Sequence, residues 1–206
     1  DCRFMAFNTV EAATQIWIKG REFTIERLLG NGFLGSKHDL DSYRNGGGLS
    51  IFRLAPQDYH RFHCPADAVV GKITTIEGQY YTVNPMAIRS AIDVYGENVR
   101  VIVPFHSKEF GLFYCVCIGA MMVGSTIMSV KEGDHVKRGQ EMGYFAFGGS
   151  TLVMVFEQGR VQFDEDLIQN SEKAIETLVR VGMRIGRNTN SVEQGVQVKI
   201  EADESQ

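Results

Sequence analysis

The chain has 206 residues, with 21 Lys and Arg against 25 Asp and Glu, and a formal net charge of -4 at pH 7. Its length and its 44% of hydrophobic residues suit one globular domain, and the four prolines argue against a largely disordered chain. The mildly acidic balance argues against a nucleic-acid-binding protein, which would need a basic surface. No apolar run approaches the roughly 20 residues that span a bilayer, and no signal peptide is visible at the start.

The N-terminal half predicts short strands separated by glycine-containing turns, with a few helical segments. Alternation predicts a strand over Thr14–Ile18, and ERLL predicts one helical turn closed by Gly30. LSIFRLA follows three glycines as a strand, and residues 69–83 read as a hairpin around Gly78. Apolar spacing after Pro85 predicts a helix over Pro85–Tyr95.

The C-terminal half predicts buried strands. Three apolar runs carry this prediction: VRVIVPF, FGLFYCVCIGAMMVGSTIMSV and GSTLVMVFE. Ala174–Val181 predicts a helix, and residues 188–206 turn polar, as expected of a frayed tail. We therefore expect an α+β fold: a single β-rich, barrel-like or sandwich-like domain with a few peripheral helices.

The four cysteines are Cys2, Cys64, Cys115 and Cys117. The last two are separated by one residue in an apolar strand, so their side chains should face the same side. None of the four has the spacing of a zinc site, and we expect inert thiols in a reducing compartment.

The first candidate site is the histidine pair in Tyr59-His60-Arg61-Phe62-His63. Two histidines this close can supply a base and a substrate contact at neutral pH. The alternative is that both are ordinary polar surface residues.

The second candidate site lies in KEGDHVKRGQEMGYFAFGGST, residues 131–151. Its Gly-Asp-x-Val-x-x-Gly-Gln turn is like that of biotinyl and lipoyl carrier domains, but Gly149 occupies the place of the carrier lysine. Ser150 stands at the mouth of a buried strand, and Gly149 leaves its own carbonyl open to attack. The alternative is a plain turn, since Ser125 in VGST has a similar pattern.

These segments together resemble the phosphatidylserine decarboxylase family. The resemblance extends from about Gln57 to Arg187 and rests on QDYHRFHCPAD, GQYYTVNPMAIRS, ENVRVIVPF, IGAMMVGST, VKRGQEMGYFAFGGST and FDEDLIQNS in that order. The GGST form looks more like the non-mitochondrial eukaryotic branch than the LGST form of bacterial and mitochondrial members.

The resemblance implies a self-processing proenzyme. Ser150 would attack the Gly149 carbonyl, cutting the chain into residues 1–149 and 150–206 and leaving a pyruvoyl group at position 150. By the same resemblance, His63 is the base of an Asp-His-Ser arrangement and His60 serves decarboxylation. Asp1 fits the aspartate. The pyruvoyl carbonyl would take the substrate's amine and act as an electron sink, with no metal.

The resemblance implies phosphatidylserine as substrate and phosphatidylethanolamine as product. It also implies a membrane partner, an endomembrane location (Golgi, endosome or vacuole), and a heterodimer of the two cleavage products. Trp17, Phe33 and Leu34 are candidate membrane contacts, and the alternative for them is ordinary core packing. A higher homo-oligomer is left open.

Three alternatives are also left open. A free aromatic amino acid could be the substrate, in the cytoplasm, or Ser150 could belong to a Ser-His-Asp hydrolase, although a Gly-x-Ser-x-Gly elbow is lacking. A non-catalytic carrier barrel is disfavoured by the missing lysine.

Overall fold

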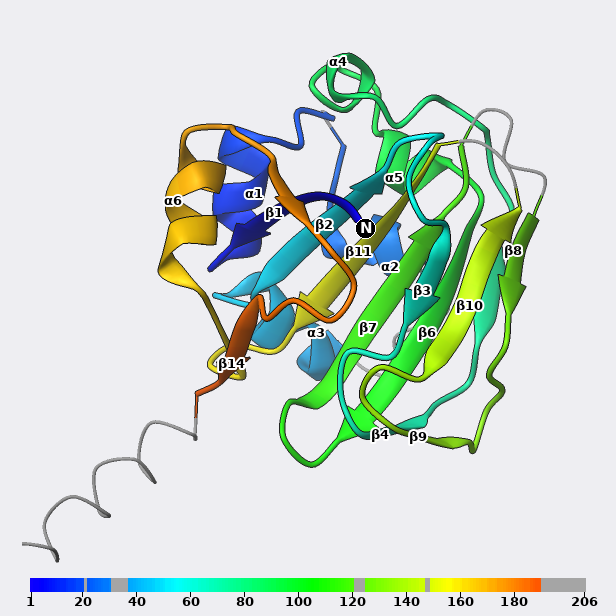
Figure 1. Ribbon diagram of the computed structural model, residues 1–206. Helices are drawn as coiled ribbons and strands as arrows, with labels where there is room; N and C mark the ends of the chain where they lie inside the picture. Colours follow the sequence, from blue (N-terminus) through cyan, green and yellow to red (C-terminus); the bar gives the residue numbers. More distant parts are fainter. Residues whose placement is uncertain (21, 31–36, 121–124, 147–148, 190–206) are drawn as a thin grey trace, which may run out of the picture.

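The computed structural model describes residues 1–20, 22–30, 37–120, 125–146 and 149–189, and within these the chain is rich in antiparallel strands. The largest sheet contains β1 (Cys2–Phe7), β2 (Leu49–Leu54), β4 (Ala68–Val70), β5 (Thr74–Ile76), β6 (Arg100–Ser107), β7 (Gly111–Ile118), β9 (His135–Val136), β11 (Ser150–Phe156) and β13 (Thr177–Val179). Its order is β13-β1-β2-β11-β7-β6-β4-β9, with β5 paired to β6. Strand β11 therefore lies inside the sheet, between β2 and β7 (Figure 1).

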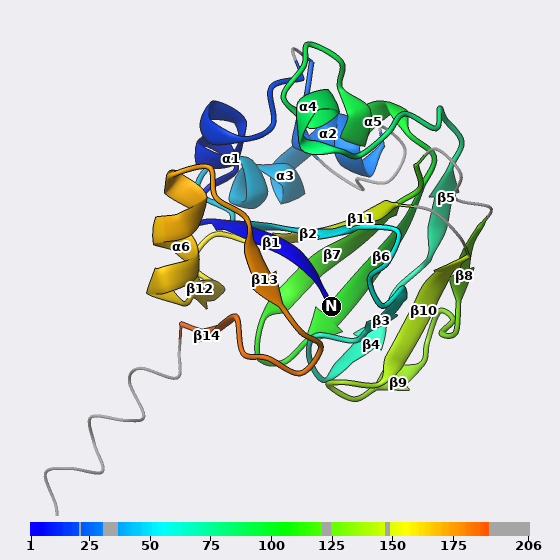
Figure 2. The same cartoon turned by 45° about the horizontal axis from the view of Figure 1, so that its top comes forward.

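Two smaller sheets complete the β structure. A three-stranded sheet is ordered β3 (Arg61–His63), β10 (Glu141–Ala146), β8 (Ser125–Met128), and a two-stranded sheet pairs β12 (Val161–Phe163) with β14 (Gly186–Asn188). The helices are α1 (Val10–Ile16), α2 (Ile25–Leu29), α3 (Lys37–Arg44), α4 (Pro85–Ile88), α5 (Val94–Glu97) and α6 (Glu165–Glu172). Figure 2 shows α1–α5 on one side of the large sheet, with the three-stranded sheet on the other. The α+β, β-rich prediction is confirmed.

Several element predictions are confirmed. The strand LSIFRLA forms β2, VRVIVPF forms β6, and GSTLVMVFE forms β11. The short helix over Glu26–Leu29 is α2, which Gly30 ends with a φ of 83°. Thr24 caps its start, since its hydroxyl accepts from the Arg27 N–H at 3.1 Å.

Two secondary-structure assignments are wrong because local caps and distant pairing overrode the local pattern. Most of Thr14–Ile18 lies in helix α1 and its C-terminal turn, because Thr9 caps the helix and Trp17 N–H donates to the Ala13 carbonyl at 2.9 Å. Ala174–Val181 contains strand β13 instead of a helix: Ala174 has a φ of 58°, and residues 177–179 pair with β1.

The hairpin predicted over residues 69–83 is also absent. Strand β5 pairs with β6, and Gln79 bridges to Asn98 instead. The helix predicted over Pro85–Tyr95 is broken into α4 and α5, because the Ser90 hydroxyl donates to the Ala87 carbonyl where α4 ends.

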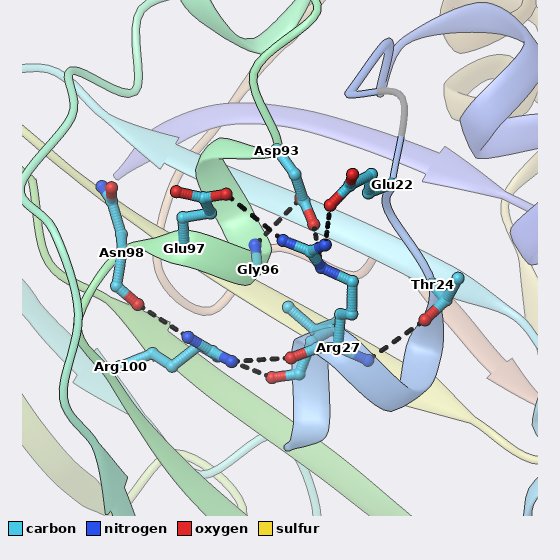
Figure 3. Close-up of polar contacts among 9 residues, drawn as sticks. Glu22, Thr24, Arg27, Asp93, Gly96, Glu97, Asn98 and Arg100 are labelled. Carbon is cyan, nitrogen blue, oxygen red and sulfur yellow. Dashed lines mark hydrogen bonds and ion pairs between the residues drawn. The ribbon is translucent and has the colours of Figure 1, made fainter. Parts of the chain in front are cut away.

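A buried polar network joins α2 to the start of β6 (Figure 3). The Arg100 guanidinium donates to the carbonyls of Leu28, Arg27 and Asn98 at 2.7, 2.6 and 2.8 Å. Burial lowers the pKa of Arg100, so its charge persists in the interior because these carbonyls satisfy its donors. The same residue therefore holds the last turn of α2 against the sheet.

The network continues to carboxylates around Arg27. The Arg27 Nε lies 3.1 Å from Asp93 Oδ2, and Glu22 and Glu97 also pair with this guanidinium (Figure 3). Burial raises the pKa of Asp93, while its bond from the Gly96 N–H and the charge of Arg27 oppose that rise. The segment between β5 and β6 is thereby fixed at its C-terminal end.

Arg100→Ala should destabilise the fold by about 3 kcal/mol, because three buried carbonyls lose a charged donor at once. Chemical unfolding followed by circular dichroism measures the change. Arg160→Ala is the control, since Arg160 is exposed and, among the described residues, its one ion pair is with Glu157 three residues away. We expect a change within about 0.5 kcal/mol. Equal unfolding midpoints for the two variants would show that the network contributes little.

Candidate functional site

Ser150 is the first residue of strand β11 and is fully buried. Its hydroxyl oxygen has no hydrogen-bond partner among the described residues. A buried hydroxyl without a partner is uncommon, because its desolvation is left uncompensated. The position therefore carries an available nucleophile at the entrance of a rigid central strand.

Gly149 precedes this serine in an ordinary backbone conformation. A Cβ placed on Gly149 would meet only the Leu54 carbonyl oxygen at 3.6 Å and Val83 Cγ2 at 4.0 Å, both ordinary contacts. The folded structure itself therefore does not require glycine at this position. A requirement for glycine would have to come from the reaction at its carbonyl.

Alternation along β11 divides its side chains between two faces of the sheet. Leu152, Met154 and Phe156 line a cavity of about 670 Å³ on one face. Ser150 shares their parity, so its side chain points to the same face. Leu54, the residue of β2 that pairs with Ser150, also lines the cavity.

The cavity lies between the large sheet, strand β3 and the segment of residues 179–188. Its interior is mainly apolar: Phe52, Leu54, Phe62, Phe113, Met142, Leu152, Met154, Phe156 and Phe163. Asp1 and His63 belong to the same lining. The structure thus brings together, around one cavity, two of the residues that the sequence predicted as a site.

His63 is held at both ring nitrogens. Its Nδ1 lies 2.9 Å from the Gly139 carbonyl oxygen, and its Nε2 lies 3.0 Å from the Tyr59 hydroxyl. A carbonyl oxygen can only accept, so we assign the proton to Nδ1, which leaves Nε2 as an acceptor. The Tyr59 ring also stacks on the imidazole at a centroid distance of 5.9 Å. This tautomer is the one that a general base needs.

Asp1 is exposed, and its carboxylate accepts from the Val181 N–H at 3.1 Å. The Gly139 carbonyl accepts the hydrogen bond from His63 Nδ1, the contact that was expected of the aspartate. Asp1 therefore ties the start of the chain to the segment that closes the cavity.

His60 lies just before β3 and is not part of the cavity lining. Its Nδ1 donates to the Asp58 carbonyl at 2.6 Å, and its own carbonyl accepts from Phe145 N–H at 3.0 Å. The two histidines consequently occupy different surroundings, although only two residues separate them.

Sequence reasoning missed the role of Asp58. One of its carboxylate oxygens accepts from the Ala55 N–H at 2.7 Å and from Arg3 at 2.7 Å. These bonds close the turn that carries His60 and join it to β1. The available signal was the Ala-Pro-Gln-Asp tetrapeptide, in which proline and aspartate favour a turn.

All four cysteines are buried and free of disulfides. Burial raises the pKa of the Cys2 and Cys64 thiols to about 12. Both therefore remain protonated at neutral pH, as the prediction of inert thiols requires. In the described part of the chain, no three His, Cys, Asp or Glu side chains gather as a set of metal ligands.

The membrane contact expected at Trp17 is wrong. Trp17 is only 4% exposed, and Arg89 lies over its ring at 5.7 Å. The other two candidates, Phe33 and Leu34, lie outside the described residues. Among the helices that the structure describes, none combines the length and the apolarity needed to cross a bilayer.

Comparison with known proteins gives consistent results. The family model for phosphatidylserine decarboxylase matches residues 1–187. The chain is 56% identical over 188 residues to phosphatidylserine decarboxylase proenzyme 3 of Schizosaccharomyces pombe, covering 91% of this chain and 19% of that protein. It is 48% identical over 205 residues to proenzyme 2 of Saccharomyces cerevisiae, covering 99% and 17%.

Bacterial relatives are less identical to this chain, but the chain covers a larger share of their length. The proenzyme of Fusobacterium nucleatum is 36% identical over 190 residues, covering 92% of this chain and 61% of that protein. Higher identity to the fungal proteins agrees with the eukaryotic branch expected from the GGST form. The chain spans only about a fifth of the length of those fungal relatives. Since the family model covers nearly all of the described residues, the chain belongs to the phosphatidylserine decarboxylase family.

Proposed function

We propose that this chain is the catalytic domain of a decarboxylase that converts phosphatidylserine to phosphatidylethanolamine after cleaving itself between Gly149 and Ser150. The observation that carries the proposal is the buried Ser150 hydroxyl, which has no partner among the described residues and faces the side of the sheet where His63 lines the cavity. The names of the relatives, which are proenzymes, support processing. Family membership supports the substrate.

The cleavage proceeds through an ester. His63 Nε2 takes the Ser150 hydroxyl proton while Oγ bonds to the Gly149 carbonyl carbon. The C–N bond to Ser150 then breaks, and the freed nitrogen takes the proton. Loss of the Ser150 α-proton expels the Gly149 carboxylate, and water replaces the nitrogen, releasing ammonia. The products are residues 1–149 and a shorter piece with a pyruvoyl group at position 150.

Residues around His63 suit this task. The Gly139 carbonyl fixes the imidazole tautomer. The Tyr59 hydroxyl donates to Nε2, and the Ser150 hydroxyl would replace it as the donor when the serine is activated. Asp1 lines the same cavity, and its carboxylate accepts from the Val181 N–H at 3.1 Å.

The two pieces should remain one unit after cleavage. Strand β11 stays paired on both sides, with β2 and β7, and β1 pairs with β13. Arg53 and Glu176 form a two-pronged ion pair at 2.7 and 2.6 Å across the division. The interface between the pieces is therefore the interior of a sheet.

The pyruvoyl group would supply the carbonyl that takes the substrate's amine and withdraws electrons as carbon dioxide leaves. The residues present fit it, because Ser150 is buried and its hydroxyl has no hydrogen-bond partner among the described residues. His60, held by Asp58, would move a proton at the reacting carbon or contact the substrate carboxylate.

Two alternatives are weaker. An α/β-hydrolase would present its serine on a sharp strand-to-helix turn, whereas Ser150 begins an interior strand. A free aromatic amino acid would fill only a small part of a cavity of about 670 Å³ whose interior is mainly apolar. The lipid substrate implies a membrane-associated enzyme, and we propose an endomembrane location.

Ser150→Ala should give an intact, folded and inactive chain, because alanine lacks the attacking oxygen. The wild type should separate under denaturing conditions into residues 1–149 and 150–206, yet elute as one species on native gel filtration. Mass spectrometry of both preparations measures this. An active wild type that remains a single 23.0 kDa chain contradicts the proposal.

The two histidines should separate by role. His63→Ala should slow cleavage by roughly 10²–10⁴-fold, the usual contribution of a general base. His60→Ala should still cleave but should release carbon dioxide poorly. Gel analysis with a carbon dioxide assay decides between them, and the reverse pattern would exchange the two assignments.

Asp58→Ala should preserve cleavage while lowering kcat for decarboxylation by about tenfold, because the turn beneath His60 loses its closure. Asp58→Asn keeps an oxygen acceptor and should recover part of the loss. The matched control is Asp134→Ala, since Asp134 closes an exposed turn by the same bond, from the N–H three residues earlier at 3.0 Å. Equal kcat in the Asp58→Ala and Asp134→Ala variants would exclude a positioning role.

A further inference from the structure

Large apolar side chains are exposed along the segment that closes the cavity. Leu178 is 71% exposed, Val181 54% and Met183 55%. They lie on and just after β13, a strand at the edge of the large sheet. Such a group of apolar side chains on the surface is typical of an interaction site.

The same segment is rich in arginine. Arg180, Arg184 and Arg187 line the cavity together with Arg61 and Arg138, against only two carboxylates, Asp1 and Glu109. Arg61 pairs with Glu141 and Arg138 with Glu109, so the excess of positive charge at the cavity is smaller than the lining alone indicates. Within the described part of the chain, Arg180 and Arg187 have no ion pair, whereas Arg184 pairs with Asp164.

The cavity behind this segment has an apolar interior that extends along β11. Leu152, Met154 and Phe156 form one wall, and Phe52 and Phe113 lie on the flanking strands. Ser150 is not itself part of the lining, but by alternation it faces the same side of β11 as this wall and lies two residues before Leu152.

We propose that residues 178–187 dock on an anionic bilayer and that the cavity receives one acyl chain of a membrane glycerophospholipid. The inference deepens the proposed function by giving the lipid a binding site. Burial of acyl methylene groups supplies the affinity, and Arg180 and Arg187 attract lipid phosphates and carboxylates. The Val181–Asp1 hydrogen bond connects the docking segment to the proposed site.

Vesicle binding tests the docking surface. All variants are made in the Ser150→Ala chain, so that neither cleavage nor turnover affects the result. Sedimentation uses vesicles of phosphatidylcholine alone or with about 30 mol% phosphatidylserine. The anionic lipid gives the mixed vesicles a negative surface potential that attracts cationic side chains. Leu178→Asp combined with Val181→Asp should weaken binding about tenfold on the mixed vesicles.

Two further variants make this test specific. Arg180→Ala should weaken binding about fivefold on the anionic vesicles and leave it unchanged on neutral ones. Met86→Asp is the matched control, since Met86 is 84% exposed on α4, outside the docking segment and the cavity lining; its binding should stay within about twofold. If Met86→Asp weakens binding and the Leu178/Val181 pair does not, the docking surface is elsewhere.

Photolabelling tests the cavity. Phosphatidylserine with a diazirine midway along one acyl chain, carried in the same vesicles, should label peptides that contain Leu152, Met154 or Phe113. Labelling confined to residues 175–187 would support docking of this segment on the bilayer and overturn the entry of an acyl chain into the cavity. Labelling of neither region would overturn both the docking and the acyl-chain proposal. Failure of the proposed function would appear separately, as a wild-type chain that neither cleaves nor decarboxylates while the Ser150→Ala chain is still labelled.

Discussion

The interior position of strand β11 is the constraint on which the rest of the structure depends. Strand β11 pairs with β2 over residues 150–155 and with β7 over residues 151–156, so Ser150 is held in the sheet by its pairing with Leu54. Ser150 is the first residue of the strand, and the proposed cleavage bond lies directly before it. Breaking this bond removes no strand pairing, which explains how a chain could be cut beside its own core and keep its fold.

The two faces of β11 serve different purposes. Val153 and Val155 alternate with the cavity-lining residues and are fully buried on the opposite face of the strand. Helices α1–α5 cover one side of the large sheet, where Arg100 and Arg27 bind buried carbonyls and carboxylates. The other side is left with an apolar cavity. A sheet with polar anchoring on one face and an open apolar space on the other can be rigid and still admit a ligand.

Prediction from sequence succeeded where one local pattern dominated. The apolar runs of β2, β6 and β11 are long and flanked by turn residues, so their strands were evident. It failed where the partner was distant. Residues 177–179 have helical spacing but form a strand because β1 offers an unpaired edge, and the sequence left Trp17 open between membrane contact and core packing, of which the structure shows core packing. The turn closed by Asp58 was visible in the sequence, yet its contact with Arg3, 55 residues away, was not.

The sequence by itself determined the family, through the order of six short motifs, and the candidate cleavage bond and candidate histidines, because each motif consists of residues that are close together along the chain. Only the tertiary structure decided that the Gly139 carbonyl, and not Asp1, accepts the hydrogen bond from His63 Nδ1. It also decided that Asp1 meets Val181, 180 residues away, and that the arginine-rich segment closes an apolar cavity. These contacts depend on how the strands are ordered in the sheet, and no local spacing of residues encodes that order.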